Sequence, residues 1–199
     1  MPVFEPFTLQ TPRLTLRFLE PYDADALFAI YADPQAMRYW SCAPWRELGQ
    51  AASHIATSRQ HYDSGESLRL AITLAATGEL IGTATLYAFH RANRRCEIGY
   101  MLSRSHWGQR YMPEALAALI DHGFGALDLH RIEADLHPAN DASATILERL
   151  HFRQEGRLRE RWFVDGELSD SVIYGLLRSD WRAARGNDNG GKPGPAPVV

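Results

Sequence analysis

Apolar and polar residues alternate over residues 13–18, which predicts a β-strand with one buried face. The apolar positions then change to a helical period. Pro21 and Asp23 suit the first turn of a helix, and Asp33–Pro34 ends its pattern. A second stretch with an apolar stripe at helical spacing covers residues 47–63. The first third of the chain therefore predicts one strand followed by two helices.

Three strand-like runs follow, at residues 68–74, 80–89 and 95–102. The turns between them centre on Thr77–Gly78 and Ala92–Asn93. Because short turns join antiparallel neighbours, we expect these three strands to form a meander.

The rest of the chain mixes helices and strands. The pattern predicts a helix from Pro113–Glu114 to Leu127, a strand at 131–137 and a helix that starts at Asn140–Asp141. Two last strands, at about 157–164 and 172–177, flank the hairpin signal Asp165–Gly166. The order β-α-α-β-β-β-α-β-α-β-β predicts an α/β (α+β) fold, with a single mixed, mostly antiparallel central sheet and helices on both faces. It does not determine the order of the strands in the sheet.

Composition narrows the class of protein. The chain has 199 residues, of which 45% are hydrophobic and 23% charged, with a net charge of −3. A domain dedicated to nucleic acid would carry a basic excess, so direct nucleic-acid binding is not expected. The longest apolar runs are too short for a membrane span, no leader pattern is present, and Cys42 and Cys96 suggest no disulfide framework. We expect a cytoplasmic protein with one domain at 1–185 and a flexible Gly/Pro-rich tail at 186–199.

Five segments carry a resemblance to a known family. They are residues 97–102, 107–116, 129–134, 138–143 and 151–156, which begin Glu-Ile-Gly-Tyr, Trp-Gly-Gln-Arg, Leu-His-Arg-Ile, Pro-Ala-Asn-Asp and His-Phe-Arg-Gln. In order and spacing they resemble the GCN5-related N-acetyltransferase (GNAT) superfamily, and in particular the branch that acetylates the N-termini of ribosomal proteins. The resemblance covers about residues 11–181. It implies an acetyl-CoA N-acetyltransferase fold, acetyl-CoA as co-substrate and an amine as acceptor, in a monomer or homodimer.

The resemblance also implies where the cofactor binds. The strand that ends at Met101 and Leu102 would separate from its parallel neighbour and pair with the pantetheine arm. The following loop would hold the pyrophosphate, and Asn140 and Ser143 would lie beside the arm and its sulfur, with Ser143 donating to the departing thiolate. The alternative for Asn140 and Ser143 is a role in the helix start alone. The residues assigned to the loop are Trp107, Gly108, Gln109, Arg110, Tyr111 and Met112.

This chain departs from the superfamily's pattern in that loop. Trp107, Arg110 and Met112 stand where the loop usually has Gln or Arg, Gly, and Gly or Ala. His151 replaces the Gly that precedes Phe152. Backbone N–H groups at a helix N-terminus can still bind phosphate if the new side chains tolerate the same φ and ψ.

Two carboxylates are candidates for the general base. Glu97 stands in an apolar strand beside the expected cofactor site, where related enzymes often have a glutamate that acts through water. The alternative is an ion pair with Arg94 or Arg95. Glu160 is the second candidate, because strict alternation would put it on the apolar face of its strand with Leu158, Trp162 and Val164. The branch can place a catalytic glutamate in this strand, although the alignment puts it at Trp162.

The acceptor is less constrained than the reaction. Tyr39, Trp40 and Trp45 are candidate walls of its pocket, with aromatic core packing as the alternative. The eight histidines show no metal-binding spacing, so no metal is expected. An α-amine has a pKa near 7.7–8.0 against about 10.4 for lysine, which favours a protein N-terminus as the acceptor. A small amine such as an antibiotic or polyamine, and a non-catalytic acyl-CoA-binding module, remain as alternatives.

Overall fold

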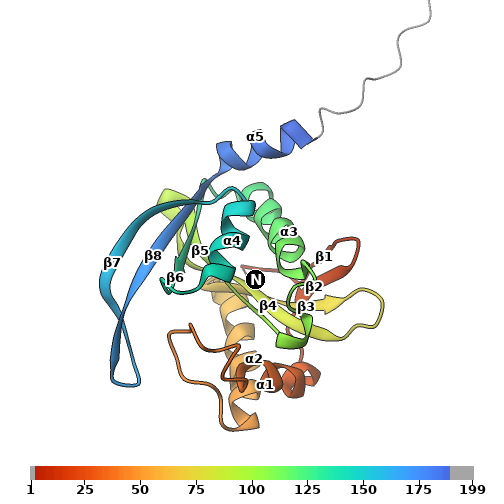
Figure 1. Ribbon diagram of the computed structural model, residues 1–199. Coiled ribbons are helices and arrows are strands. Elements are labelled where there is room, and N and C mark those ends of the chain that lie inside the picture. The colour runs from red at the N-terminus through yellow and green to blue at the C-terminus, as the bar shows by residue number, and fades with distance from the viewer. Residues whose placement is uncertain (1–2, 189–199) are drawn as a thin grey trace, which may run out of the picture.

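The computed structural model describes residues 3–188, which form one mixed sheet of eight strands with helices on both faces (Figure 1). The strands lie in the order β1-β2-β3-β4-β5-β6-β8-β7. They are β1 (Thr8–Gln10), β2 (Leu14–Phe18), β3 (Ser67–Leu74), β4 (Leu80–His90), β5 (Arg95–Leu102), β6 (Arg131–Leu136), β7 (Arg153–Val164) and β8 (Glu167–Leu177). The helices are α1 (Ala24–Tyr31), α2 (Leu48–Ser64), α3 (Tyr111–Gly125), α4 (Asp141–Arg149) and α5 (Arg178–Asp188). The predicted fold class is confirmed.

The sheet combines a meander with one crossover. β3, β4 and β5 pair antiparallel in sequence order, as the short turns predict. The crossover through α3 then places β6 parallel to β5, and every other neighbouring pair within residues 3–188 is antiparallel. β8 lies between β6 and β7, so the crossover through α4 does not join adjacent strands.

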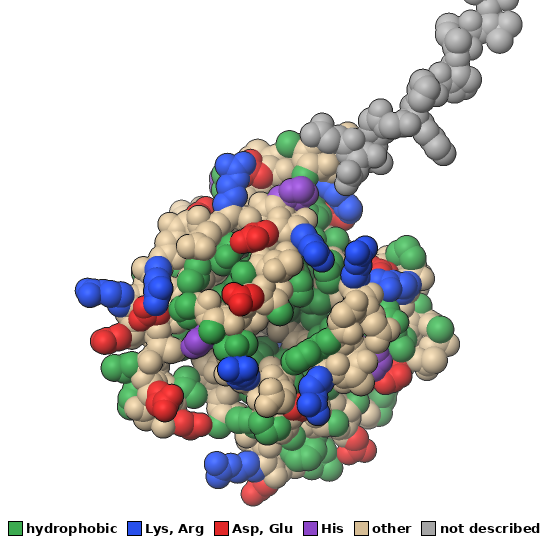
Figure 2. All heavy atoms as spheres, viewed as in Figure 1, with side chains coloured by type: hydrophobic (Ala, Val, Ile, Leu, Met, Phe, Trp, Pro, Cys, Tyr) green, Lys and Arg blue, Asp and Glu red, His purple; other side chains and the backbone are tan. Residues whose placement is uncertain are grey.

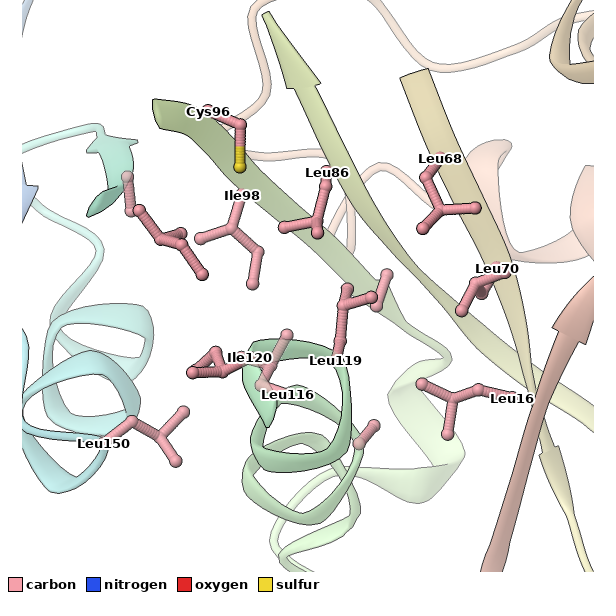
Figure 3. Close-up of a cluster of buried hydrophobic side chains, with 14 of the residues drawn as sticks. Leu16, Leu68, Leu70, Leu86, Cys96, Ile98, Leu116, Leu119, Ile120 and Leu150 are labelled. Carbon is pink, nitrogen blue, oxygen red and sulfur yellow. The ribbon is translucent and has the colours of Figure 1, made fainter. Parts of the chain in front are cut away.

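Two apolar clusters fix the helices to the sheet. The larger one packs α3 and α4 on one face, where Leu116, Leu119 and Ile120 meet Leu70 and Ile98 (Figure 3). The smaller one packs α1 and α2 on the opposite face, and its members include Leu27, Ile55, Ala71 and Met101. Leu70 and Ile72 of β3 belong to the larger cluster and Ala71 between them to the smaller one, so both faces of this central strand are buried there.

Two elements, β1 and α5, were not predicted from the sequence pattern. β1 has three residues at the edge of the sheet, too few to show a period. α5 is strongly polar, and its buried Trp181 docks it by donating from Nε1 to Asp121 over 2.7 Å. The expected tail at 186–199 lies outside the described residues except for its first three, which end α5. No helix among residues 3–188 is long and apolar enough to cross a bilayer.

The parallel pair β5–β6 is short and is reinforced by ion pairs. Arg95 on β5 contacts Glu133 on β6 at 2.9 Å, and Arg131 contacts Glu133 at 2.7 Å and also pairs with Glu155 of β7. The hydrogen bonds to Glu155 and Glu133 raise the pKa of Arg131. This network ties together the strands on either side of the point where β5 and β6 meet.

A close approach between β4 and β5 requires glycine at Gly82. A Cβ there would overlap the Met101 carbonyl oxygen and touch Leu102. We expect Gly82→Ala to lower the free energy of unfolding by about 1–3 kcal/mol, because the backbones of two central strands must move apart.

Gly49→Ala is the control, since a Cβ at Gly49 in α2 would have no neighbour within 4 Å. Alanine should be neutral or stabilising there, by up to about 1 kcal/mol. Urea unfolding of both variants measures the difference, and equal stability of the two would contradict the packing argument.

Candidate active site

The site begins where β5 and β6 separate. β5 pairs with β6 from Arg95 to Glu97 only, whereas its pairing with β4 continues to Leu102. From Ile98 onward the β6 side of β5 therefore has no strand partner, and its backbone groups are available to a ligand. This is the separation that the resemblance implies.

A cavity of about 640 Å³ lies at this gap and reaches both faces of the sheet. Ile98, Tyr100 and the start of α4 line it on the face that carries α3 and α4. Arg69 and Thr85 line it on the face that carries α1 and α2. The loop between α1 and α2, the end of β6 and the tip of the β7–β8 hairpin complete the walls. A ligand on one face can thus meet a ligand on the other through the gap in the sheet.

The start of α4 presents both of its expected residues to this cavity. Asn140 caps the helix, since its Oδ1 accepts a hydrogen bond from the Ser143 N–H at 3.2 Å. The Tyr100 hydroxyl donates to the Ser143 carbonyl at 3.4 Å, and burial raises the pKa of Tyr100. The same two residues therefore take part in the helix cap and line the cavity, Asn140 capping through its side chain and Ser143 through its backbone N–H.

The loop before α3 is shaped by its side chains and leaves its backbone exposed. The Trp107 indole donates to the Leu102 carbonyl at 2.9 Å, Gln109 Nε2 donates to the Ser105 carbonyl, and the Met112 side chain is buried in the larger cluster. Gly108 has φ +76° and Arg110, the N-cap of α3, has φ +61°. The side chains brace the loop, so a ligand would be met mainly by backbone.

Two of the departures from the superfamily's pattern occupy the backbone conformation that glycine favours. Arg110 has φ +61° and His151 has φ +65°, both in the left-handed region. A non-glycine residue in this conformation costs about 1 kcal/mol, so both turns are strained at these positions.

Arg13, the residue just before β2, holds the loop from outside as a clamp. Its Nη1 donates to the Gln109 carbonyl at 3.0 Å and its Nη2 to the Arg110 carbonyl at 3.2 Å. Its Nε pairs with Glu114 at 2.6 Å, and Glu114 also accepts from the Thr11 hydroxyl. Although partial burial opposes the shift, the hydrogen bonds from Thr11 and Arg13 hold the pKa of Glu114 below its usual value.

The clamp determines where the loop's donors point. In a trans peptide the C=O and N–H groups point in opposite directions. Because Arg13 holds the carbonyls of Gln109 and Arg110, the N–H groups of Arg110 and Tyr111 point away from it. Together with the unsatisfied N–H groups of the first turn of α3, they suit a phosphate group. These donors are of the kind that the resemblance requires for a pyrophosphate at this loop.

The two expected bases lie in different surroundings. Glu97 is half-buried on β5 opposite Tyr87 of β4, at the last residue pair before the gap. Tyr87 lines the cavity and Glu97 does not. Burial, and after it the Glu97 carboxylate, raise the pKa of Tyr87, so the hydroxyl of this cavity-lining residue stays protonated.

Glu160 does not lie on a buried face, and in this respect the alternation is wrong. The pairing of β7 with β8 shifts register between Leu158 and Trp162, and Glu160 sits in this bulge with φ +49°. Its side chain is exposed and its N–H donates to Asp170 at 2.9 Å. Trp162 lines the cavity, whereas Glu160 does not.

The three aromatic residues expected to line the acceptor pocket have different surroundings. Tyr39 and Trp40 line the cavity, and the Tyr39 ring stacks on His137 at 5.1 Å between centroids. Trp45 is directed elsewhere, because it stacks on the buried ring of Tyr31 at 4.5 Å within the smaller cluster. For Trp45 the alternative of core packing is the one observed.

Several cavity residues were not singled out from the sequence. Tyr87 and Tyr100 are aromatic residues within predicted strands, which gave no reason to assign them to a site. Nothing in the sequence distinguished Asp135 in its short strand. Asp135 accepts from Arg161 Nε at 2.7 Å and from the Trp162 indole at 3.4 Å. Arg69 did carry a signal, as the one charged residue of β3. Within the described part of the chain, no group of three or more His, Cys, Asp or Glu side chains is arranged to hold a metal ion.

Charged side chains of both signs are scattered over the face drawn in Figure 2, without a large patch of one sign. This agrees with the small net charge of −3. Long-range steering of a strongly charged partner is therefore not a property of this face.

Comparison with known proteins places this site in a family. The family description "Acetyltransferase (GNAT) domain" matches residues 13–153. The chain is 38% identical to the protein named "Uncharacterized N-acetyltransferase p20" from Bacillus licheniformis, over 87% of this chain and 98% of that one. It is 26% identical to "[Ribosomal protein uS5]-alanine N-acetyltransferase" from Escherichia coli, over 89% and 94%.

Among solved structures, the chain is similar to "Mycobacterium smegmatis RimJ in complex with CoA-disulfide". The identity is 28%, the TM-score is 0.79, and the match covers 91% of this chain and 94% of that one.

The clamp generates a test. We expect Arg13→Gln to raise the KM for acetyl-CoA by roughly tenfold, because the loop loses the contacts that orient its N–H groups. The kcat at saturating acetyl-CoA should change by less than about threefold. Arg59→Gln is the control, since Arg59 pairs with Glu20 on the surface outside the site. A fall in kcat with an unchanged KM would contradict this role.

Proposed function

The chain belongs to the acetyltransferase (GNAT) family and is an acetyl-CoA-dependent N-acetyltransferase, for which we propose a protein N-terminal α-amine as the acceptor. The observation that carries the proposal is the cavity that passes through the gap between β5 and β6. It brings the expected cofactor side, at the start of α4, next to a second compartment lined by Tyr39, Trp40 and the hairpin. The similarity to the Escherichia coli enzyme named "[Ribosomal protein uS5]-alanine N-acetyltransferase" supports the type of acceptor.

Two parts of this chain would bind acetyl-CoA: the loop before α3 and the free edge of β5. The N–H groups of Arg110 and Tyr111 hold the pyrophosphate, and the unpaired edge of β5 from Ile98 to Leu102 holds the pantetheine arm. When bound, acetyl-CoA supplies an acetyl thioester at the gap. A backbone N–H of β5 that hydrogen-bonds the carbonyl oxygen would stabilise the charge that develops on it.

Glu97 is the proposed general base. Because Glu97 does not line the cavity and its strand neighbour Tyr87 does, it accepts the proton of the acceptor ammonium through water or through the Tyr87 hydroxyl. An α-amine requires only a modest base near neutral pH, which suits a half-buried carboxylate. Ser143 is the proposed donor to the leaving thiolate, since its backbone is fixed by Asn140 and Tyr100 while its side chain faces the cavity.

A small primary amine is the second candidate acceptor. The cavity volume of about 640 Å³ falls in the range typical of small-molecule sites. The hairpin favours a larger acceptor, because Leu168 lines the cavity, is 57% exposed and could contact residues beyond the amine.

An acceptor panel distinguishes these candidates. We expect release of free CoA from acetyl-CoA to require a peptide with a free N-terminus, and an N-terminally blocked copy to be inactive. Spermidine and an aminoglycoside are the small-amine arms, and a higher kcat/KM for either one would replace the proposed acceptor. Binding of acetyl-CoA without turnover of any amine would favour a binding module.

The base is tested by a matched pair of variants. We expect Glu97→Gln to lower kcat by 10²–10⁴-fold while acetyl-CoA binding survives, because the amide keeps the shape but cannot take the proton. The acidic limb of the pH–rate profile should shift or disappear. Glu160→Gln should retain most of the activity, since Glu160 is exposed in a bulge outside the cavity. The reverse result would assign the base to β7.

A further inference from the structure

Arg69 is a cation placed inside the molecule on the acceptor side of the cavity. It is half-buried in β3, on the face that α2 covers, and it lines both the main cavity and a neighbouring hollow of about 550 Å³. Its Nη1 donates to the hydroxyl of Ser58 at 2.9 Å. Ser58 is itself fully buried and donates to the His54 carbonyl at 2.8 Å. The guanidinium is thus held in place by one neutral, well-anchored partner.

No carboxylate neutralises this guanidinium within residues 3–188. Fifteen ion pairs occur there, and none includes Arg69. Burial, and after it the charges of Arg69 and His61, lower the pKa of His54 to about 3. The His54 imidazole is therefore neutral near pH 7 and adds no charge beside the Arg69 guanidinium. A half-buried cation that lacks an anion is unfavourable, and the unfavourable part is recovered when a ligand supplies the anion.

Strand register fixes how far Arg69 lies from the gap. Arg69 is directly opposite Thr85 on β4, and Thr85 is opposite Gly99 on β5. All three line the cavity, and Gly99 lies just beyond the last β5–β6 pair. Because adjacent strands are about 4.8 Å apart, the row spans roughly 10 Å between backbones. An extended peptide covers this length in two or three residues.

The other charges of the cavity differ between its two sides. Arg38, stacked on Tyr39 in the α1–α2 loop, is a second cation that lines the cavity. The acidic side chains Asp165 and Glu167 belong to the hairpin, on the other side of β5, and Asp135 at the end of β6 is already paired with Arg161. An acceptor whose ammonium lies at β5 and whose anionic group lies toward β3 would match both ends.

We propose that Arg69 binds a carboxylate of the acceptor, and that the preferred acceptors are primary amines with an acidic group about two or three residues from the amine. This inference rests on the acetyl transfer proposed above and specifies its substrate class. The free N–H groups of the guanidinium can hold a carboxylate through two parallel hydrogen bonds, which an amide or a cation cannot accept in the same way.

The test compares peptides that differ in one charge. Amidated hexapeptides carry Ala at the N-terminus and Glu, Gln or Lys at the second position, and a second set carries the same change at the third. We expect kcat/KM for the better of the two Glu peptides to exceed that of its Gln counterpart by roughly 10–100-fold, with the Lys peptide lowest. Glutamate and spermidine, as an acidic and a cationic small amine, show whether a free amino acid satisfies the same site.

Variants assign the preference to the side chain. Arg69→Gln should reduce the Glu-to-Gln ratio to within about twofold, and Arg69→Lys should give an intermediate ratio because it keeps the charge without the planar fork. Arg91→Gln is the control, since Arg91 lines the neighbouring hollow but not the main cavity, and it should keep the wild-type ratio. Thermal unfolding of each variant shows whether it is folded. If Arg69→Gln does not fold, the Glu-to-Gln ratio of Arg69→Lys decides the inference.

The outcomes separate this inference from the proposed function. Acetylation of all the peptides at equal rates by the wild type overturns this inference and leaves the proposed function standing. If no amine is acetylated, the proposed function fails, and calorimetric titration of the CoA-bound protein with the Glu and Gln peptides decides the inference separately. Equal affinities there, or a Glu-to-Gln ratio that survives Arg69→Gln, would also overturn it.

Discussion

β5 and β6 stay paired for three residues and then diverge, and the active-site chemistry depends on how firmly that short contact is held. A parallel pair of this length has few backbone hydrogen bonds of its own. The ion pairs among Arg95, Arg131, Glu133 and Glu155 reinforce it from three strands, while α3 packs its apolar side against the same strands. The gap is present in the structure without a ligand, so the free backbone groups of β5 are already placed for binding.

The two halves of the site are supported in different ways. The cofactor half is held by contacts between distant segments, as when Arg13 orients a loop almost a hundred residues away in the sequence. The acceptor half is lined by the α1–α2 loop and a hairpin tip, which surround a rigid row of strand residues. This division suits an enzyme whose first substrate is always the same and whose second must be selected.

The sequence was informative wherever a period extended over a full element. The strands and helices between Leu14 and Leu177 were predicted in the right order, because most of them bury a face that shows in the pattern. The exposed strand β7 was predicted from the hairpin signal Asp165–Gly166 beside it. Strand order was not, since β8 reaches β6 only through a long hairpin. Glu160 was misplaced by a bulge that alternation cannot reveal, and Trp45 by an aromatic partner remote in sequence. In the sequence, Arg69 appeared only as one charged residue in an apolar strand, and its lack of a carboxylate partner could not be predicted.

The acceptor walls come from two segments that carry little of the sheet. The loop at 32–47 lies between helices, and the hairpin tip projects beyond β6, so both can change length or composition while the β5–β6 contact and its ion pairs persist. After gene duplication, copies of such a chain can diverge in the amines they recognise while the machinery for acetyl-CoA drifts slowly. Paralogues of this protein should therefore differ most at these two segments, and their substrates should differ accordingly.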